Sequence, residues 1–181
     1  MDKSFENTLS GCRQVLLQGQ YLLEKMSDQQ YQTVPDVFSQ SSIGQHFRHI
    51  FDLWFALVKP LSKTDSTNLK FDYDNRRRGA SVERSRELAL VETRELLCWI
   101  ETLKQNVKPE HPVTVSTEVG LDQSLQAQVT STVLRELVFV SSHATHHFAL
   151  IRQLATVQGI DVLLDFGMAP ATCSFLRESV Q

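Results

Sequence analysis

The sequence predicts an all-α protein, a four-helix bundle with long connecting loops. Four long segments carry apolar residues at helical spacing. Connections of roughly 15–25 residues join them, which permits an order other than a simple meander. Because 181 residues suit one hydrophobic core, we expect a single domain over residues 1–181. Long loops in a compact domain are often functional, so we expect them to gather around a site.

The first predicted helix extends from about Phe5 to Met26, where apolar residues recur at helical spacing and glutamines supply a polar face. The next stretch, Ser27–Ser41, is polar and contains Pro35, which lacks an N–H group and disfavours helix in the residue before it. This stretch is therefore predicted to be a long loop.

The second predicted helix runs from Ile43 to Val58. Ser42 and Gln45 have the spacing of a capping box, in which two side chains satisfy free N–H groups at the start of a helix. The stretch Ser62–Ala80 that follows is too polar for an interior element and rich in turn-forming residues, so it is predicted to be a second loop.

The third predicted helix begins near Ser81, an N-cap candidate, and reaches about Lys104. Its positions expected to be buried are Leu88, Val91, Leu96, Trp99, Ile100 and Leu103. Beyond this helix, short alternation on both sides of Gly120, between Val113 and Val129, predicts a small hairpin.

The fourth predicted helix spans Ser131–Val157 and stops before Gly159. Val138 is one of the apolar residues that it carries. The tail from Ile160 onward is predicted to be a loop followed by a short helix.

Composition excludes several classes of function. The formal net charge is -3, so there is no global basic field to bind nucleic acid or anionic lipid. No run approaches ~18 apolar residues and the start lacks an apolar signal region, so neither a membrane span nor secretion is expected. Cys12, Cys98 and Cys173 lie far apart, which fits a reducing cytoplasm without disulfides, and Cys98 is expected to be a small core residue.

Five of the six histidines fall in two predicted helices, and this clustering is the most informative feature of the sequence. His143 and His147 are four positions apart, so they share one helix face and can hold one ion. The second helix offers His46 and His49 as a third ligand, and His146 is another rival. Three neutral imidazoles with open positions suit a divalent metal such as Zn, Ni or Fe. The plain alternative is that the histidines fill core positions and bind nothing.

Other catalytic signatures are missing from the sequence. A zincin peptidase needs a glutamate directly after the first histidine, where this chain has Ala144. No nucleophile elbow or glycine-rich phosphate loop is found either. Those mechanisms are therefore excluded.

The segments Ser42–Ile50 and His143–His147 resemble the DinB-like superfamily of metal-binding four-helix proteins. That superfamily includes thiol-dependent transferases and the amino-terminal domains of ergothioneine-forming sulfoxide synthases. The resemblance implies an up-down-down-up bundle. Matched residue by residue, it also implies His49, His143 and His147 as metal ligands.

Two further features could belong to the same site. Glu136 lies two helical turns before His143, so it is a candidate acceptor that orients a ligand histidine; a surface carboxylate is the alternative. Arg76, Arg77 and Arg78 could form a clamp for a carboxylate or phosphate over the site, or they could be a solvated charge run.

Two functions are compatible with this sequence. The first is a metal-dependent enzyme, a transferase or hydrolase acting on a small-molecule substrate; the resemblance implies a low-molecular-weight thiol as co-substrate. The second is a non-catalytic or stress-associated metal-binding module that acts as a homodimer. Neither hypothesis involves nucleic acid or a membrane.

Overall fold

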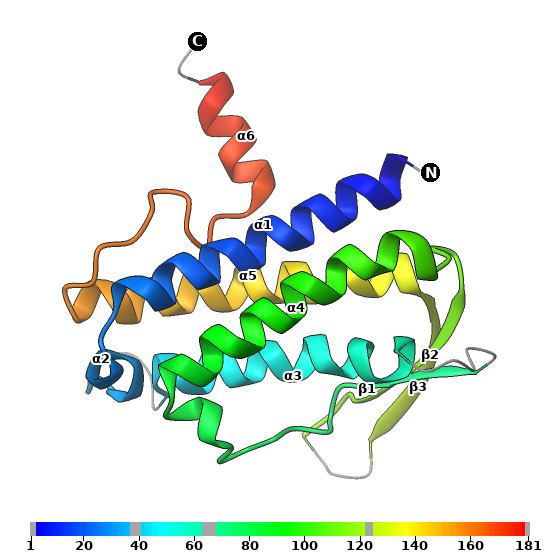
Figure 1. Ribbon diagram of the computed structural model, residues 1–181, viewed down its shortest axis with the longest axis horizontal. Coiled ribbons are helices and arrows are strands. Elements are labelled where there is room, and N and C mark those ends of the chain that lie inside the picture. Colours follow the sequence, from blue (N-terminus) through cyan, green and yellow to red (C-terminus); the bar gives the residue numbers. More distant parts are fainter. Residues whose placement is uncertain (1–2, 37–40, 63–67, 122–124, 180–181) are drawn as a thin grey trace.

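Four long helices form the body of the protein in the computed structural model (Figure 1). The structure describes residues 3–36, 41–62, 68–121 and 125–179. The parts of the predicted loops at 37–40 and 63–67, and of the hairpin at 122–124, lie outside the described residues. The four helices are α1 (Lys3–Lys25), α3 (Ile43–Leu61), α4 (Arg86–Asn106) and α5 (Val133–Val157).

The helices pack around one apolar core. Helices α1 and α5 run in one direction, and α3 and α4 run in the other (Figure 1). Helix α1 contacts α4, and α5 contacts α3. Helix α1 also lies against α5. Trp54 on α3 and Leu16 on α1 are both almost fully buried in this core. The packing follows from the apolar stripe that each helix carries.

A three-stranded mixed sheet covers one end of the bundle, so the predicted all-α class is wrong. The strands are β1 (Leu69–Asp72), β2 (Pro112–Glu118) and β3 (Gln126–Thr132). Strand β1 pairs with β2 in parallel, and β2 pairs with β3 as the predicted hairpin. Strand β1 lies in the polar stretch after α3 that was predicted to be a loop. Only Leu69 and Phe71 of its four residues face the core, so the sequence pattern does not reveal a strand there. Parallel pairing with a distant strand leaves no local sequence signal.

Two predicted segments also differ in detail. The first predicted loop contains a short helix, α2 (Asp28–Gln32), which Ser27 caps. The third predicted helix is preceded by the 3₁₀ turn η1 (Ser81–Glu83), and α4 itself starts after the N-cap Ser85. Leu96, Ile100 and Leu103 of this helix are buried as predicted. Three residues that were expected to lie in the core are exposed: Leu88, Val91 and Cys98. Val138, an apolar residue of the fourth predicted helix, is also exposed.

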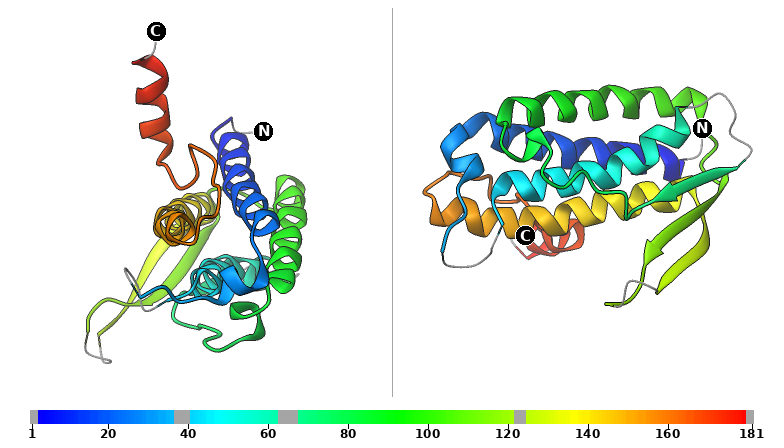
Figure 2. Two further views of the ribbon diagram at one scale, coloured as in Figure 1. Left: turned by 90° about the vertical axis from the view of Figure 1, so that its left-hand side faces the viewer. Right: turned by 90° about the horizontal axis from the view of Figure 1, so that it is seen from below.

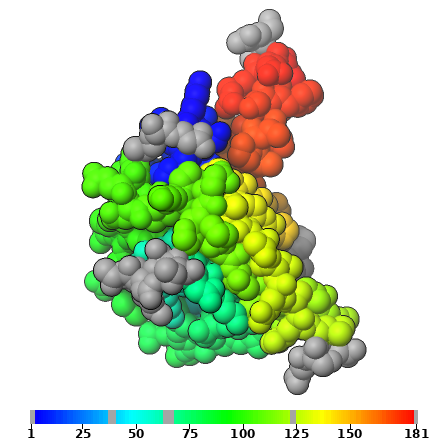
Figure 3. Space-filling view, turned by 90° about the vertical axis from the view of Figure 1, so that its right-hand side faces the viewer, coloured from blue at the N-terminus to red at the C-terminus, as the bar shows by residue number. Residues whose placement is uncertain are grey.

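The end of α5 and the tail agree with the sequence. Gly159 has φ of 67°, and Ile160 donates to the carbonyl of Ala155 at 2.9 Å, which closes the helix as a Schellman motif. The short helix α6 (Pro170–Glu178) stands away from the bundle (Figures 1 and 3). Among the described residues, no helix is long and apolar enough to cross a bilayer.

Gly44 allows the start of α3 to lie directly against η1. A Cβ atom at this position would overlap the backbone carbonyl oxygen of Glu83 and approach the Tyr31 ring to 2.7 Å. The Tyr31 hydroxyl also donates to the carbonyl of Val82 at 2.7 Å, so both neighbours are held in place. A side chain at position 44 therefore has no space to enter.

Substituting Gly44→Ala should lower the free energy of unfolding by about 1–3 kcal/mol, as expected for overpacking. The matched substitution Gly11→Ala on α1, where a Cβ meets nothing within 4 Å, should be stabilising by up to about 1 kcal/mol through helix propensity. Urea denaturation of both variants measures the difference. Equal effects of the two substitutions would contradict the close approach at Gly44.

Candidate metal centre

The candidate metal centre lies in the seam between α3 and α5. These two helices are in contact and run antiparallel (Figure 1). His46 therefore faces His147, and His49 faces His143. Ser42 and Gln45 fix the start of α3 as the predicted capping box, with side-chain hydrogen bonds of 3.2 and 2.9 Å. His46 and His49 follow within the first two turns.

Three imidazoles meet in this seam, those of His49, His143 and His147, and we call them the three-histidine cluster. One nitrogen from each ring lies within 4.8 Å of the others. The Nε2 atoms of His49 and His143 are 2.9 Å apart. The ring centroid of His147 lies 4.6 Å from that of each other member. All three side chains are half-buried, so the cluster borders solvent on one side.

The two rival histidines are placed differently. His46 is half-buried, and its Nδ1 lies 3.0 Å from Nδ1 of His147. Its Nε2 is buried and has no hydrogen-bond partner among the described residues. His146 is exposed on the outer side of α5, with its ring centroid 5.5 Å from that of His147. His46 therefore contacts His147 of the cluster, whereas His146 is exposed to solvent.

Burial lowers the pKa of the cluster imidazoles. The pKa of His49 falls from 6.5 to about 4, first through burial and then through the charges of His143 and Arg76. Burial, followed by the neighbouring imidazoles, lowers the pKa of His147 to about 3. The pKa values of His46 and His143 are also lowered, chiefly by burial. These imidazoles are therefore neutral near pH 7, which is the form that binds metal ions.

Comparison with known proteins identifies the family. The model of the DinB superfamily matches residues 12–151. The chain belongs to the DinB superfamily. A curated protein from Rhizopus delemar, FK506-binding protein 5, is 32% identical over 110 residues, which cover 59% of this chain and 28% of that protein. The chain thus spans less than a third of the length of this relative. No solved structure gives a significant match.

The donor set of this DinB superfamily protein fits a divalent metal. Nitrogens bound to a tetrahedral ion at about 2.1 Å lie roughly 3.4 Å from one another. The cluster nitrogens lie within 4.8 Å of one another, so small ring rotations bring them to that separation. Neutral imidazoles are ordinary ligands for Zn, Ni and Fe. The three-histidine cluster is therefore compatible with metal binding.

Glu136 is fully buried, but its partners are not histidines. Its carboxylate accepts hydrogen bonds from the hydroxyls of Tyr73 and Ser131 and from the guanidinium of Arg135, at 2.5, 2.6 and 2.8 Å. Burial and this hydrogen bond raise the pKa of Tyr73, so the phenol remains a donor. These contacts give no support to the predicted role of Glu136 in orienting a ligand histidine. They attach the start of α5 to the segment after β1.

The three arginines that could form a clamp have different roles. Arg77 is engaged inside the protein, with its Nε 2.6 Å from Asp52 and its terminal nitrogens 2.8 and 2.9 Å from Glu92. Arg76 and Arg78 are exposed. A clamp of all three arginines is therefore wrong, because Arg77 already has two carboxylate partners.

Sequence reasoning missed a buried ion-pair network beside the cluster. Arg48 on α3 contacts Asp52 on the same helix and Glu83 on η1, both at 2.9 Å. The available signal was a pair of opposite charges four positions apart on a mostly apolar helix. This spacing could not reveal Glu83 as a partner of Arg48, because tertiary packing alone brings η1 to α3.

Acidification should destabilise the metal-free protein between about pH 6.5 and pH 4. In that window the unfolded chain binds protons at His49 and His147, whose pKa values of about 4 and 3 keep the folded imidazoles neutral. The free energy of unfolding, measured by urea denaturation from pH 7.5 to 4.5, should therefore fall.

The double variant His49→Asn/His147→Asn provides the comparison, since it removes both titrating rings. Its free energy of unfolding should depend less on pH across the same window. The variant His146→Asn, which removes an exposed imidazole of α5, serves as the matched control. The same pH dependence in the double variant and the wild type would contradict the assignment.

Proposed function

We propose that the protein binds a divalent metal ion through His49, His143 and His147 and acts as a metal-dependent enzyme on a small-molecule substrate. The observation that carries the proposal is the meeting of three neutral imidazoles from two helices within 4.8 Å. Membership of the DinB superfamily supports the same role. The reaction class is a thiol-dependent transfer or a hydrolysis.

An ion held by three imidazoles keeps open positions, where it can polarise a carbonyl group or lower the pKa of a bound water or thiol. The protein supplies the neutral ligands and a half-buried seam. Among the described residues, no carboxylate is hydrogen-bonded to a member of the cluster. Proton transfer would therefore involve solvent or the substrate itself, which favours a nucleophile such as a thiol that ionises readily.

His46 has the position of a residue that orients a ligand. If His147 binds the ion through Nε2, its Nδ1 carries the proton and can donate it to an acceptor, and Nδ1 of His46 lies 3.0 Å away. His46 then acts as the acceptor and holds the ring of His147 in one tautomer. In this arrangement His46 is a positioning residue, and His49 is the ligand that α3 supplies.

A non-catalytic metal-binding dimer is the second candidate. It is favoured by Leu88 and Val91 on α4, which lie about one helical turn apart and are each 41% exposed. Apolar residues on one surface can pack against a second copy of the chain. In this case chelation would change stability and association without affecting any turnover.

Metal binding should depend on all three members of the cluster. Replacing His49, His143 or His147 singly with Ala should weaken the binding of Zn²⁺ or Ni²⁺ by more than about 100-fold, which exceeds the effect expected for residues that only orient ligands. At a thousandfold excess over the dissociation constant, the ion should stabilise the wild type by about 4 kcal/mol. Competition with a chromophoric chelator and thermal unfolding measure the two effects.

The control variant is again His146→Asn, which should bind metal like the wild type. Activity is tested by screening thiol conjugation and ester or amide cleavage with and without chelator. Failure of the untagged protein to bind Zn, Ni or Fe would refute the proposal. Metal binding with no chelator-sensitive turnover would favour the non-catalytic dimer, and light scattering would then test association.

Replacing His46 should separate orientation from coordination. His46→Leu removes the acceptor for His147 and should weaken metal binding about 10–100-fold. His46→Asn places an oxygen near the original Nδ1 and should restore most of the affinity. Competition titrations give the affinities, and the melting temperatures of the metal-free variants check that the fold is intact. Equal affinities of the Leu and Asn variants would contradict the role of His46.

A further inference from the structure

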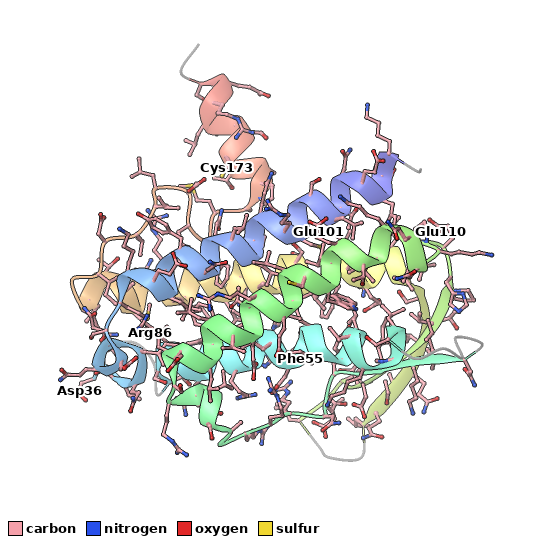
Figure 4. The ribbon with its side chains drawn as sticks, in the orientation of Figure 1. Asp36, Phe55, Arg86, Glu101, Glu110 and Cys173 are labelled. Carbon is pink, nitrogen blue, oxygen red and sulfur yellow. The ribbon has the colours of Figure 1, made fainter. Side chains whose placement is uncertain are left out.

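The segment between β1 and η1 crosses over α3 (Figure 2, right), and Arg77 fixes it there. The guanidinium of Arg77 binds Asp52 and Glu92, and the backbone N–H of the same residue donates to Asp52 at 3.0 Å. Its carbon Cζ also lies 4.9 Å from the ring centroid of Phe55, which is labelled on α3 in Figure 4. A side chain with this many partners holds the adjoining backbone in place. The residues on either side of it therefore extend from a fixed position.

Those neighbours, Arg76 and Arg78, line one polar hollow of about 660 Å³ together with Asp74 and Glu118. Neither arginine forms an ion pair with another described residue. One oxygen of Asp74 is already used, since it accepts from the backbone N–H of Glu118 at 2.7 Å. The hollow therefore presents two guanidinium groups whose donors are free for a ligand.

The segment that carries Arg76 lies beside the three-histidine cluster. Arg77 binds Asp52, which follows His49 by three positions on α3. On the other side, the Tyr73 ring lies 5.2 Å from that of Phe139, which in turn lies 5.8 Å from the ring of His143.

The positive charge of Arg76 is one of the causes, after burial, that lower the pKa of His49 and of His143. The other charged groups that act on His49 are Arg48 and Asp52, which bind each other. Arg76 is therefore the cation near the cluster that has no carboxylate partner of its own.

A divalent ion and a guanidinium repel each other at short range unless an anion lies between them. Guanidinium groups bind carboxylates and phosphates through paired N–H donors. The acidic side chains of Asp74 and Glu118 in the same hollow disfavour a doubly charged phosphate more than a singly charged carboxylate. The hollow therefore suits one carboxylate group.

We infer that Arg76 binds a carboxylate of the substrate while another atom of the same molecule binds the metal at the three-histidine cluster. This inference rests on the proposed metal-dependent function and adds the class of substrate, a small organic acid. Arg78 contributes a second donor in the same hollow. Arg77 takes no direct part and positions the segment through Asp52 and Glu92.

The test compares two probes that differ in charge alone, 3-mercaptopropionate and its amide. Both present a thiolate, which is a strong ligand for Co²⁺, and the carboxylate is present in only one of them. The cobalt-loaded protein is titrated with each probe, and binding is followed by thiolate-to-cobalt absorption. The wild type should bind the acid about tenfold more tightly than the amide, as expected for a charge-assisted pair. Added salt should reduce this preference.

Arg76→Ala should abolish the preference for the acid while leaving cobalt affinity unchanged or slightly higher, because a repelling charge is removed. Arg76→Lys should keep part of the preference. The matched control is Arg94→Ala, which removes an exposed arginine on α4. Its preference should remain that of the wild type.

These outcomes separate a failure of the inference about Arg76 from a failure of the proposed metal-dependent function. Equal binding of acid and amide to the wild type, or an unchanged preference in Arg76→Ala, would overturn the inference while the metal centre stands. Failure to bind cobalt at all would overturn the proposed function and this inference with it. Stronger competition by inorganic phosphate than by acetate would overturn the choice of a carboxylate.

Discussion

The antiparallel contact between α3 and α5 is the interaction on which the candidate site depends. Phe47 and Phe148 are buried neighbours in this contact, with ring centroids 5.9 Å apart, and each directly adjoins a histidine in the sequence. Apolar packing therefore fixes the relative position of the two helices, and the half-buried imidazoles meet as a result. The same burial disfavours protonation of these rings. Packing thus provides both the geometry and the neutral state that a metal ion requires.

A second constraint is the set of buried charges around Asp52. Its carboxylate binds Arg48 within α3 and Arg77 from the segment that crosses the helix. Leaving such a carboxylate buried without partners would be costly, so the network holds the crossing segment closely against α3. The backbone next to Arg77, including Arg76, is consequently held beside α3. The network therefore lies beside the candidate metal centre on the same helix.

The small sheet determines where α5 begins. Strand β3 ends at Thr132, and the side chain of this residue caps α5 at once, without an intervening loop. Glu136 in the first turn is bound by Tyr73, which follows β1. The sheet thus connects the start of α5 to the segment that carries the arginines. The sheet therefore helps to position α5, which carries His143 and His147 of the candidate metal centre.

Local chemistry in the sequence determined the four long helices, the capping box at Ser42, the stop at Gly159 and the spacing of histidines on each helix. These features depend on hydrogen bonds and side chains a few residues apart. The spacing left His46 and His49 open, and the family resemblance implied His49, which lies beside His143. Tertiary structure alone decided which of the three arginines binds carboxylates and that β1 pairs with β2. Each of these depends on contacts between segments that are distant in the chain, and the short apolar pattern of a four-residue strand cannot specify its partner.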